Sequence, residues 1–202
     1  MPRKFAFIAI ALALLAPLAV QAAESTAPRK TLKPFSIYLD SPMAIRATDI
    51  YRSHAELFDE EAIALRRAGE LSAHLRTVKI CQKGADSIAL ARKPGPLMVV
   101  AGAGMCTGGR IMHHLQNHLS DPATMVLMVG YQSRGSVGRA LIDRAKEVRI
   151  AGQRVQVRAR THLFGGLSGH PGQSDLLRWM GSLAPSRPRV LLTHGEDGPR
   201  KA

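Results

Sequence analysis

A glycine-rich stretch at residues 101–110 has the composition of an anion-binding turn. It reads Ala-Gly-Ala-Gly-Met-Cys-Thr-Gly-Gly-Arg and lies between an apolar run and a segment with helical spacing. Glycines let backbone N–H groups approach an anion, and the N-terminus of a following helix adds the positive end of its dipole. Here Thr107 can cap the helix and Arg110 can pair with a phosphate. Tight strand-to-helix packing also favours glycine, so the spacing alone leaves phosphate binding and plain packing both open.

Two histidines stand where side chains often do chemistry. His170 lies in a glycine-flanked turn just before a helical pattern, and a histidine there can act as a general acid or donate to a phosphate. His194 follows an apolar run at 190–193, at the expected carboxyl end of a strand, where open α/β sheets place functional groups. The spacing equally fits a turn histidine that bonds its own loop and a strand-end histidine that faces solvent.

The charge of the chain favours a polyanionic partner. Its 202 residues include 28 Lys and Arg against 15 Asp and Glu, a formal net charge of +13. This excess favours nucleic acid or an anionic membrane surface, although it also serves solubility alone. A hydrophobic content of 46% rules out a wholly disordered chain, and two cysteines rule out a disulfide framework. An aromatic content of 4% argues against a single-strand binder built on stacking platforms.

The N-terminal segment has the three parts of a secretory signal. A basic start precedes an uncharged apolar run at 5–20 and a small-residue exit at Ala22. The run is short for a membrane-spanning helix. We therefore expect residues 1–22 to be a cleaved signal peptide that exports the protein to the periplasm, with an uncleaved membrane anchor or an artefact of gene-start choice or fusion as alternatives. Residues 23–34 are expected to form an exposed linker.

The rest of the chain alternates strand and helix patterns. This alternation predicts an α/β fold with a mostly parallel sheet flanked by helices. The continuous apolar run at 96–101 is typical of a strand buried on both faces. The other expected strands are 35–39, 78–81, 125–129, 148–150, 155–164 (a longer antiparallel or edge strand) and 189–193. The expected helices are 43–67, 85–92, 108–119, 137–145 and 173–183.

Five motifs, taken in order, resemble those of the β-CASP metallo-β-lactamase-fold nucleases, which include bacterial RNA-processing hydrolases. They are Asp40-Ser-Pro-Met-Ala44 with Thr48 and Ile50-Tyr51, Gly104 to Ile111 with His113-His114-Leu115, Val129-Gly-Tyr-Gln132 with Gly135 and Gly138-Arg139, Ser168-Gly-His170, and His194-Gly-Glu196. The resemblance implies a β-CASP domain over residues 35–150. It also implies that residues 151–202 are the partial C-terminal segment of a metallo-β-lactamase-type sandwich.

The resemblance also implies roles for single residues. His170 corresponds to a catalytic-site histidine near the scissile phosphate, and His194 corresponds to a ligand of one of two zinc ions. Single-stranded RNA is the implied partner, because the family's β-CASP region acts as an RNA specificity domain. The expected phosphate- and RNA-binding residues are Thr107, Gly108, Gly109, Arg110, Arg139 and Ser168.

The metal site is where the sequence departs from the family. The family's zinc ions rest on a His-x-His-x-Asp-His run, and this chain contains no His-x-His pair. Zinc needs three or four protein ligands, which His194 alone does not supply. His114 and His118, four residues apart on an expected helix, could share a metal, but the family does not use the first of them in this way.

We therefore expect the region of a zinc-dependent ribonuclease-like hydrolase, truncated and inactive alone. The alternatives are a non-catalytic RNA- or polyanion-binding module and one half of a split nuclease whose partner chain supplies the metal-binding half. A homo-oligomer is a further possibility, and a membrane would be a partner only if the signal is uncleaved. The resemblance implies a cytoplasmic location, in conflict with the export signal.

Overall fold

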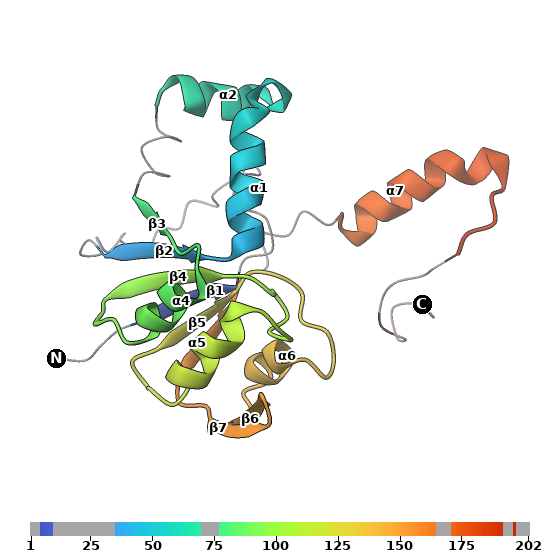
Figure 1. Cartoon of the computed structure of the whole chain (residues 1–202). Coiled ribbons are helices and arrows are strands. Elements are labelled where there is room, and N and C mark those ends of the chain that lie inside the picture. The colour runs from blue at the N-terminus through green and yellow to red at the C-terminus, as the bar shows by residue number, and fades with distance from the viewer. Residues whose placement is uncertain (1–4, 10–34, 70–76, 165–170, 192–195, 197–202) are drawn as a thin grey trace, which may run out of the picture. The chain divides into compact units, whose positions relative to one another are not determined.

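Six strands form a parallel sheet in the part of the chain that the computed structural model describes, which is residues 5–9, 35–69, 77–164, 171–191 and 196. The strand order is β3-β2-β4-β1-β5-β8, and each neighbouring pair runs in parallel (Figure 1). The carboxyl ends of the strands therefore meet at one edge, called the carboxyl edge below. The strands are β1 (Phe5–Ala9), β2 (Ser36–Asp40), β3 (Val78–Ile80), β4 (Leu97–Ala101), β5 (Met125–Met128) and β8 (Arg160–Leu163).

Helices and one antiparallel hairpin surround this sheet. The chain divides into two compact units, residues 1–168 and 169–202. The first unit contains α1 (Pro42–Ser53), the 3-10 turn η1 (Ala55–Leu57), α2 (Glu60–Arg67), α4 (Gly84–Ala91), α5 (Arg110–His118) and α6 (Val137–Ile142), together with the hairpin of β6 (Glu147–Ile150) and β7 (Gln153–Gln156). The second unit contains α7 (Gln173–Leu183) and η2 (Ala184–Ser186).

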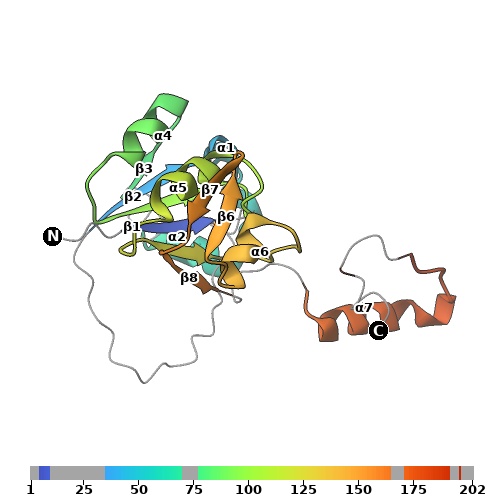
Figure 2. The same ribbon diagram turned by 90° about the horizontal axis from the view of Figure 1, so that it is seen from below.

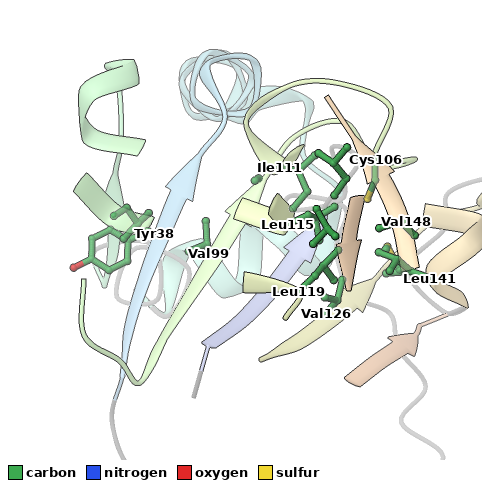
Figure 3. Close-up of a cluster of buried hydrophobic side chains, with 14 of the residues drawn as sticks. Tyr38, Val99, Cys106, Ile111, Leu115, Leu119, Val126, Leu141 and Val148 are labelled. Carbon is green, nitrogen blue, oxygen red and sulfur yellow. The ribbon is translucent and has the colours of Figure 1, made fainter. Parts of the chain in front are cut away.

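The core lies on both faces of the sheet, because successive side chains of a strand point to opposite faces. On one face, Val99 packs in a large cluster with Ile111 and Leu115 of α5 (Figure 3). On the other, Val100 packs with Ile45 of α1 in a smaller cluster. The two views of the molecule show α1 and α5 on opposite sides of the strands (Figures 1 and 2). β4 is therefore buried on both faces, which confirms the prediction from its continuous apolar run.

Three expected elements differ from the structure. The helix expected over 43–67 is divided into α1, η1 and α2, because Asp59 caps a new helix by accepting from the backbone of Ala62 at 2.8 Å. The strand expected over 155–164 is two strands: β7 pairs with β6, and β8 pairs with β5. Residues 189–191 form no strand, and the rest of that expected strand lies outside the described residues.

The N-terminal apolar run contributes β1 to the middle of the sheet. Residues of β1 pair with β4 on one side and with β5 on the other. A cleaved signal peptide would remove this strand, so the two interpretations exclude one another, and the mass of the purified chain decides between them. The export signal and the periplasmic location stay predictions. None of the helices in the described part of the chain is long and apolar enough to cross a membrane.

The sheet contains strands from both of the regions that the family resemblance divides at residue 150. β8 comes from the region expected to be a sandwich segment, yet it extends the sheet of the region expected to be the β-CASP domain. Residues 157–160 lead from β7 into β8. Their backbone N–H groups donate to the carbonyls of Lys146, Leu119 and Thr124 at 2.8–3.0 Å. Residues 157–164 therefore belong to the first compact unit.

Candidate functional site

The carboxyl edge gathers most of the motif residues in the first unit. Ser41 follows β2, residues 102–109 follow β4, residues 129–132 follow β5, and Phe164 follows β8. Residues 102–109, called the glycine loop below, were expected to form an anion-binding turn. In open sheets of parallel strands, ligands bind outside the carboxyl ends of the strands. The parallel pairing therefore brings segments more than 120 residues apart in the sequence to one place.

Asp40, the last residue of β2, is the centre of a buried polar network. Its side chain is completely buried. Its Oδ2 accepts from the hydroxyl of Ser87 on α4 and from Nε2 of His114 on α5, both at 2.6 Å. Its Oδ1 accepts from Nη1 of Arg110 at 2.6 Å. One carboxylate therefore ties the sheet to two helices.

Arg110 faces this network at the first position of α5. Its Nη1 also donates to the carbonyl of Cys81, and its Nη2 donates to the carbonyl of Gln82, each at 2.7 Å. These contacts hold the segment after β3 against the start of α5. A guanidinium has five N–H donors, so Nε and one hydrogen of Nη2 remain beyond these bonds. Arg110 thus stabilises the fold through these hydrogen bonds, while its expected phosphate contact stays a prediction.

The network keeps Asp40 ionised. Burial by itself would raise the pKa of this carboxyl, but hydrogen bonds from His114, Ser87 and Arg110 outweigh burial and lower its pKa below the ordinary value. An ionised carboxylate only accepts hydrogen bonds, so Nε2 of His114 must carry a proton. Three donors around one buried anion satisfy its charge without water.

The other histidines of α5 are held neutral. Burial, with a smaller effect of His114, lowers the pKa of His113 and lowers that of His118 to about 4. Both cysteines are buried free thiols, and burial raises the pKa of Cys81 to about 11 and that of Cys106 to about 12. Among the residues that the structure describes, no three His, Cys, Asp or Glu side chains are grouped so that they could hold a metal ion. The described donors therefore do not fit a zinc centre.

Gln132 holds the glycine loop in place. Its Nε2 donates to the carbonyl of Gly104 at 2.7 Å and to that of Gly130 at 3.0 Å, so it joins the loops after β4 and β5. The N–H of Gly138 on α6 also donates to the carbonyl of Met105 at 3.2 Å. A side chain at Gly138 would overlap Gln132, which explains why glycine stands there. The loop is thus fixed from two directions before any ligand arrives.

The glycine loop leaves the start of α5 open. The helix begins at Arg110 with Gly109 as its N-cap, and no side chain caps it. The expectation that Thr107 caps this helix is therefore wrong, because Thr107 lies two residues before the cap. Thr107 and Gly109 are both exposed. The orphan N–H groups of a helix N-terminus and an exposed hydroxyl suit a phosphate oxygen.

Basic residues concentrate in the segment after β5. Residues 134–160 contain eight Lys and Arg and only two acidic residues. Arg134 and Arg139 lie in the loop and helix that leave the carboxyl edge, and Nε of Arg139 donates to both carboxylate oxygens of Asp143 at 2.9–3.0 Å. The others lie from Arg144 through the β6–β7 hairpin to Arg160. A window count of charge would have found this segment.

Three expected site residues lie outside the described residues. They are Ser168, His170 and His194. Their roles therefore stay predictions, as do those of Thr107, Gly108, Gly109 and Arg139. Ser87 was missed, because a serine in a helical pattern carries no sign of a carboxylate 47 residues earlier in the chain.

Comparisons with known proteins agree with the motifs. The family model of the Beta-Casp domain matches residues 11–141, and that of the Zn-dependent metallo-hydrolase RNA specificity domain matches residues 154–198. Ribonuclease TTHA0252 of Thermus thermophilus is 44% identical over 161 residues, which are 80% of this chain and 36% of that protein. Transcription termination factor FttA of Methanosarcina mazei is 28% identical over 179 residues, which are 84% of this chain and 28% of that protein. The chain thus spans about a third of the length of these relatives.

Proposed function

Because the chain belongs to the β-CASP family of metallo-β-lactamase-fold RNA-processing proteins, we propose that it binds single-stranded RNA along the carboxyl edge of its sheet. The observation that carries this proposal is the convergence at that edge of the fixed glycine loop with Arg134 and Arg139. Arginine pairs with phosphate through charge-assisted hydrogen bonds, and exposed backbone N–H groups add donors that do not depend on the base.

The RNA would serve as the substrate of a zinc-dependent hydrolase of which this chain is the RNA specificity region. One of the relatives is named a ribonuclease. When zinc is bound in such an enzyme, it polarises the phosphate and activates water. The described residues include no group of His, Cys, Asp or Glu that could hold zinc. We propose His170 as the catalytic-site histidine and His194 as one zinc ligand, with the remaining ligands drawn from elsewhere.

A non-catalytic RNA-binding module is the second candidate. It is supported by the same donors, because the glycine loop and the uncapped start of α5 would contact phosphate without help from a metal ion. Both candidates require RNA at the carboxyl edge, so RNA binding is tested first.

The proposal predicts that RNA affinity falls steeply with salt, and that edge arginines set the slope. For a single strand, log K falls with log[salt] by about 0.7 per neutralised phosphate. The double variant Arg134→Gln/Arg139→Gln should lower the slope by about 1.4 if each arginine contacts one phosphate. Fluorescence anisotropy of a labelled oligouridine over a salt series measures it.

The matched control removes the same charge elsewhere. Arg149 and Arg154 face each other across the β6–β7 hairpin and are both exposed. The double variant Arg149→Gln/Arg154→Gln should leave the slope unchanged. Salt-independent binding, or an equal loss of slope in both double variants, would remove the carboxyl edge as the RNA site.

A further inference from the structure

A cavity of about 410 Å³ opens beside the carboxyl edge, between the ends of β5 and β8 and helix α6. Its walls are largely apolar. Among its lining residues are Val129, Tyr131, Arg139, Ile142, Leu163 and Phe164. The volume lies near the lower end of the range, about 300–1,000 Å³, in which proteins hold small ligands. It suits one nucleotide and is too small for a duplex.

Two aromatic side chains line this cavity while staying about half exposed. Tyr131 follows β5 and is 57% exposed, and Phe164 follows β8 and is 51% exposed. The two segments are adjacent, because the N–H of Phe164 donates to the carbonyl of Met128 at 2.7 Å. The chain has few aromatic residues, only 4% of its length, so two at one opening are notable. Exposed aromatic faces are what unpaired bases stack on.

The guanidinium of Arg139 lies at the wall of the same cavity. Arg139 lines it, and Asp143, which also lines it, holds the guanidinium through Nε at 2.9–3.0 Å. A guanidinium oriented in this way presents its charge in a set direction and loses little freedom when it binds. An apolar cavity with a guanidinium and its paired carboxylate at the wall matches a nucleotide, which joins a base to charged and polar groups, better than it matches a purely apolar side chain.

We propose that this cavity is a base-binding subsite, in which one unpaired RNA base stacks on Tyr131 and Phe164 while the adjoining phosphate contacts Arg139. The inference rests on the proposed RNA-binding function and adds to it the place where a base enters. It also refines the expectation from composition. The low aromatic content argues against an extended stacking platform, and this cavity needs only one base.

The test separates stacking from charge. Tyr131→Leu keeps an apolar side chain of useful size and removes the ring, so the affinity for oligouridine should fall about tenfold, within the range for loss of one stacked base. The slope of log K against log[salt] should stay unchanged, because no cation is removed. Tyr131→Phe keeps the ring and should keep the affinity. Tyr51→Leu on α1 removes a partly exposed ring away from the cavity and should have no effect.

An abasic oligomer of the same length tests directly whether the base contributes to binding. The wild-type chain should bind it more weakly than oligouridine, and this difference should shrink in Tyr131→Leu, in which only Phe164 is left to stack on the base. If Tyr131→Leu keeps full affinity for oligouridine while binding stays salt-dependent, the subsite is overturned and the RNA-binding function stands. If Tyr131→Phe loses as much as Tyr131→Leu, stacking is overturned. Absence of salt-dependent binding in the wild-type chain overturns the proposed function itself, and the subsite with it.

Discussion

Replacing Asp40 by alanine should lower the free energy of unfolding by about 3–5 kcal/mol, the cost of removing one partner of a buried charge network. The variant leaves Arg110 and His114 without the carboxylate that both contact at 2.6 Å. It also removes the bond that holds α4 through Ser87. Urea denaturation followed by circular dichroism measures the change.

Asp49 provides the matched control. It is an exposed acidic residue on α1, in the helix that begins two residues after Asp40. Asp49→Ala should change the free energy of unfolding by less than about 0.5 kcal/mol, as is usual for surface substitutions. An equal loss in both variants would show that general charge balance, and not the network, explains the effect.

The pH dependence gives the same network a second signature. The folded pKa of Asp40 is lowered, so its contribution to stability is complete above the ordinary value of 3.8 and is lost as the pH falls through the lower folded value. The pKa of His118 is lowered from 6.5 to about 4, so between these values the unfolded chain takes up a proton that the folded chain excludes. Stability should therefore fall from pH 6.5 towards 4 in the wild-type chain and in Asp40→Asn alike. Only the wild-type chain should show the further loss from Asp40 below 3.8.

Gly138→Ala should destabilise the protein by about 1–3 kcal/mol, the range for inserting a methyl group into a well-packed site. The added Cβ would overlap Oε1 of Gln132, and it would lie 2.8 Å from Cδ of Gln132 and 3.1 Å from the carbonyl oxygen of Met105. Gln132 is buried and bonded to two carbonyls, so it can move only by releasing the glycine loop. The gain of about 1 kcal/mol in helix propensity from glycine to alanine is too small to offset this.

Two further variants isolate the cause. Gly84→Ala also places alanine at a helix position, but nothing lies within 4 Å of its Cβ, so stability should be unchanged or higher. In a Gln132→Ala background the overlap with Gln132 is gone, so adding Gly138→Ala should cost clearly less than it does in the wild-type chain. Equal costs in both backgrounds would show that the contact with Gln132 is not responsible.

The sequence predicted the positions of the strands and helices better than it predicted which of them pair with one another. The apolar runs at 96–101 and 125–129 became β4 and β5 with small shifts at their ends, because burial on both faces leaves a strong local pattern. The residues 173–183 formed α7 as expected. The division of residues 155–164 into two strands was not predicted. The segment between β7 and β8 is held by backbone hydrogen bonds, which leave no pattern in the side chains.

The polar network shows the limit for the candidate site. The motifs singled out Asp40, Arg110 and His114 separately, but the contact between Asp40 and His114 joins residues 74 positions apart. By its chemistry alone, an arginine after a glycine turn suits a phosphate. Only the fold shows that Arg110 donates to the buried carboxylate of Asp40. Tyr131 and Phe164 likewise come together only because β5 and β8 are neighbours.

Photo-crosslinking gives the most direct test that RNA lies along the carboxyl edge. The chain is irradiated with an oligouridine containing 4-thiouridine, and mass spectrometry identifies the attached peptides. Crosslinks should map to the glycine loop at 102–109, to residues 129–139 and to Phe164, and they should weaken as salt is added. Crosslinks confined to the β6–β7 hairpin or to α1 and α2 would contradict this placement.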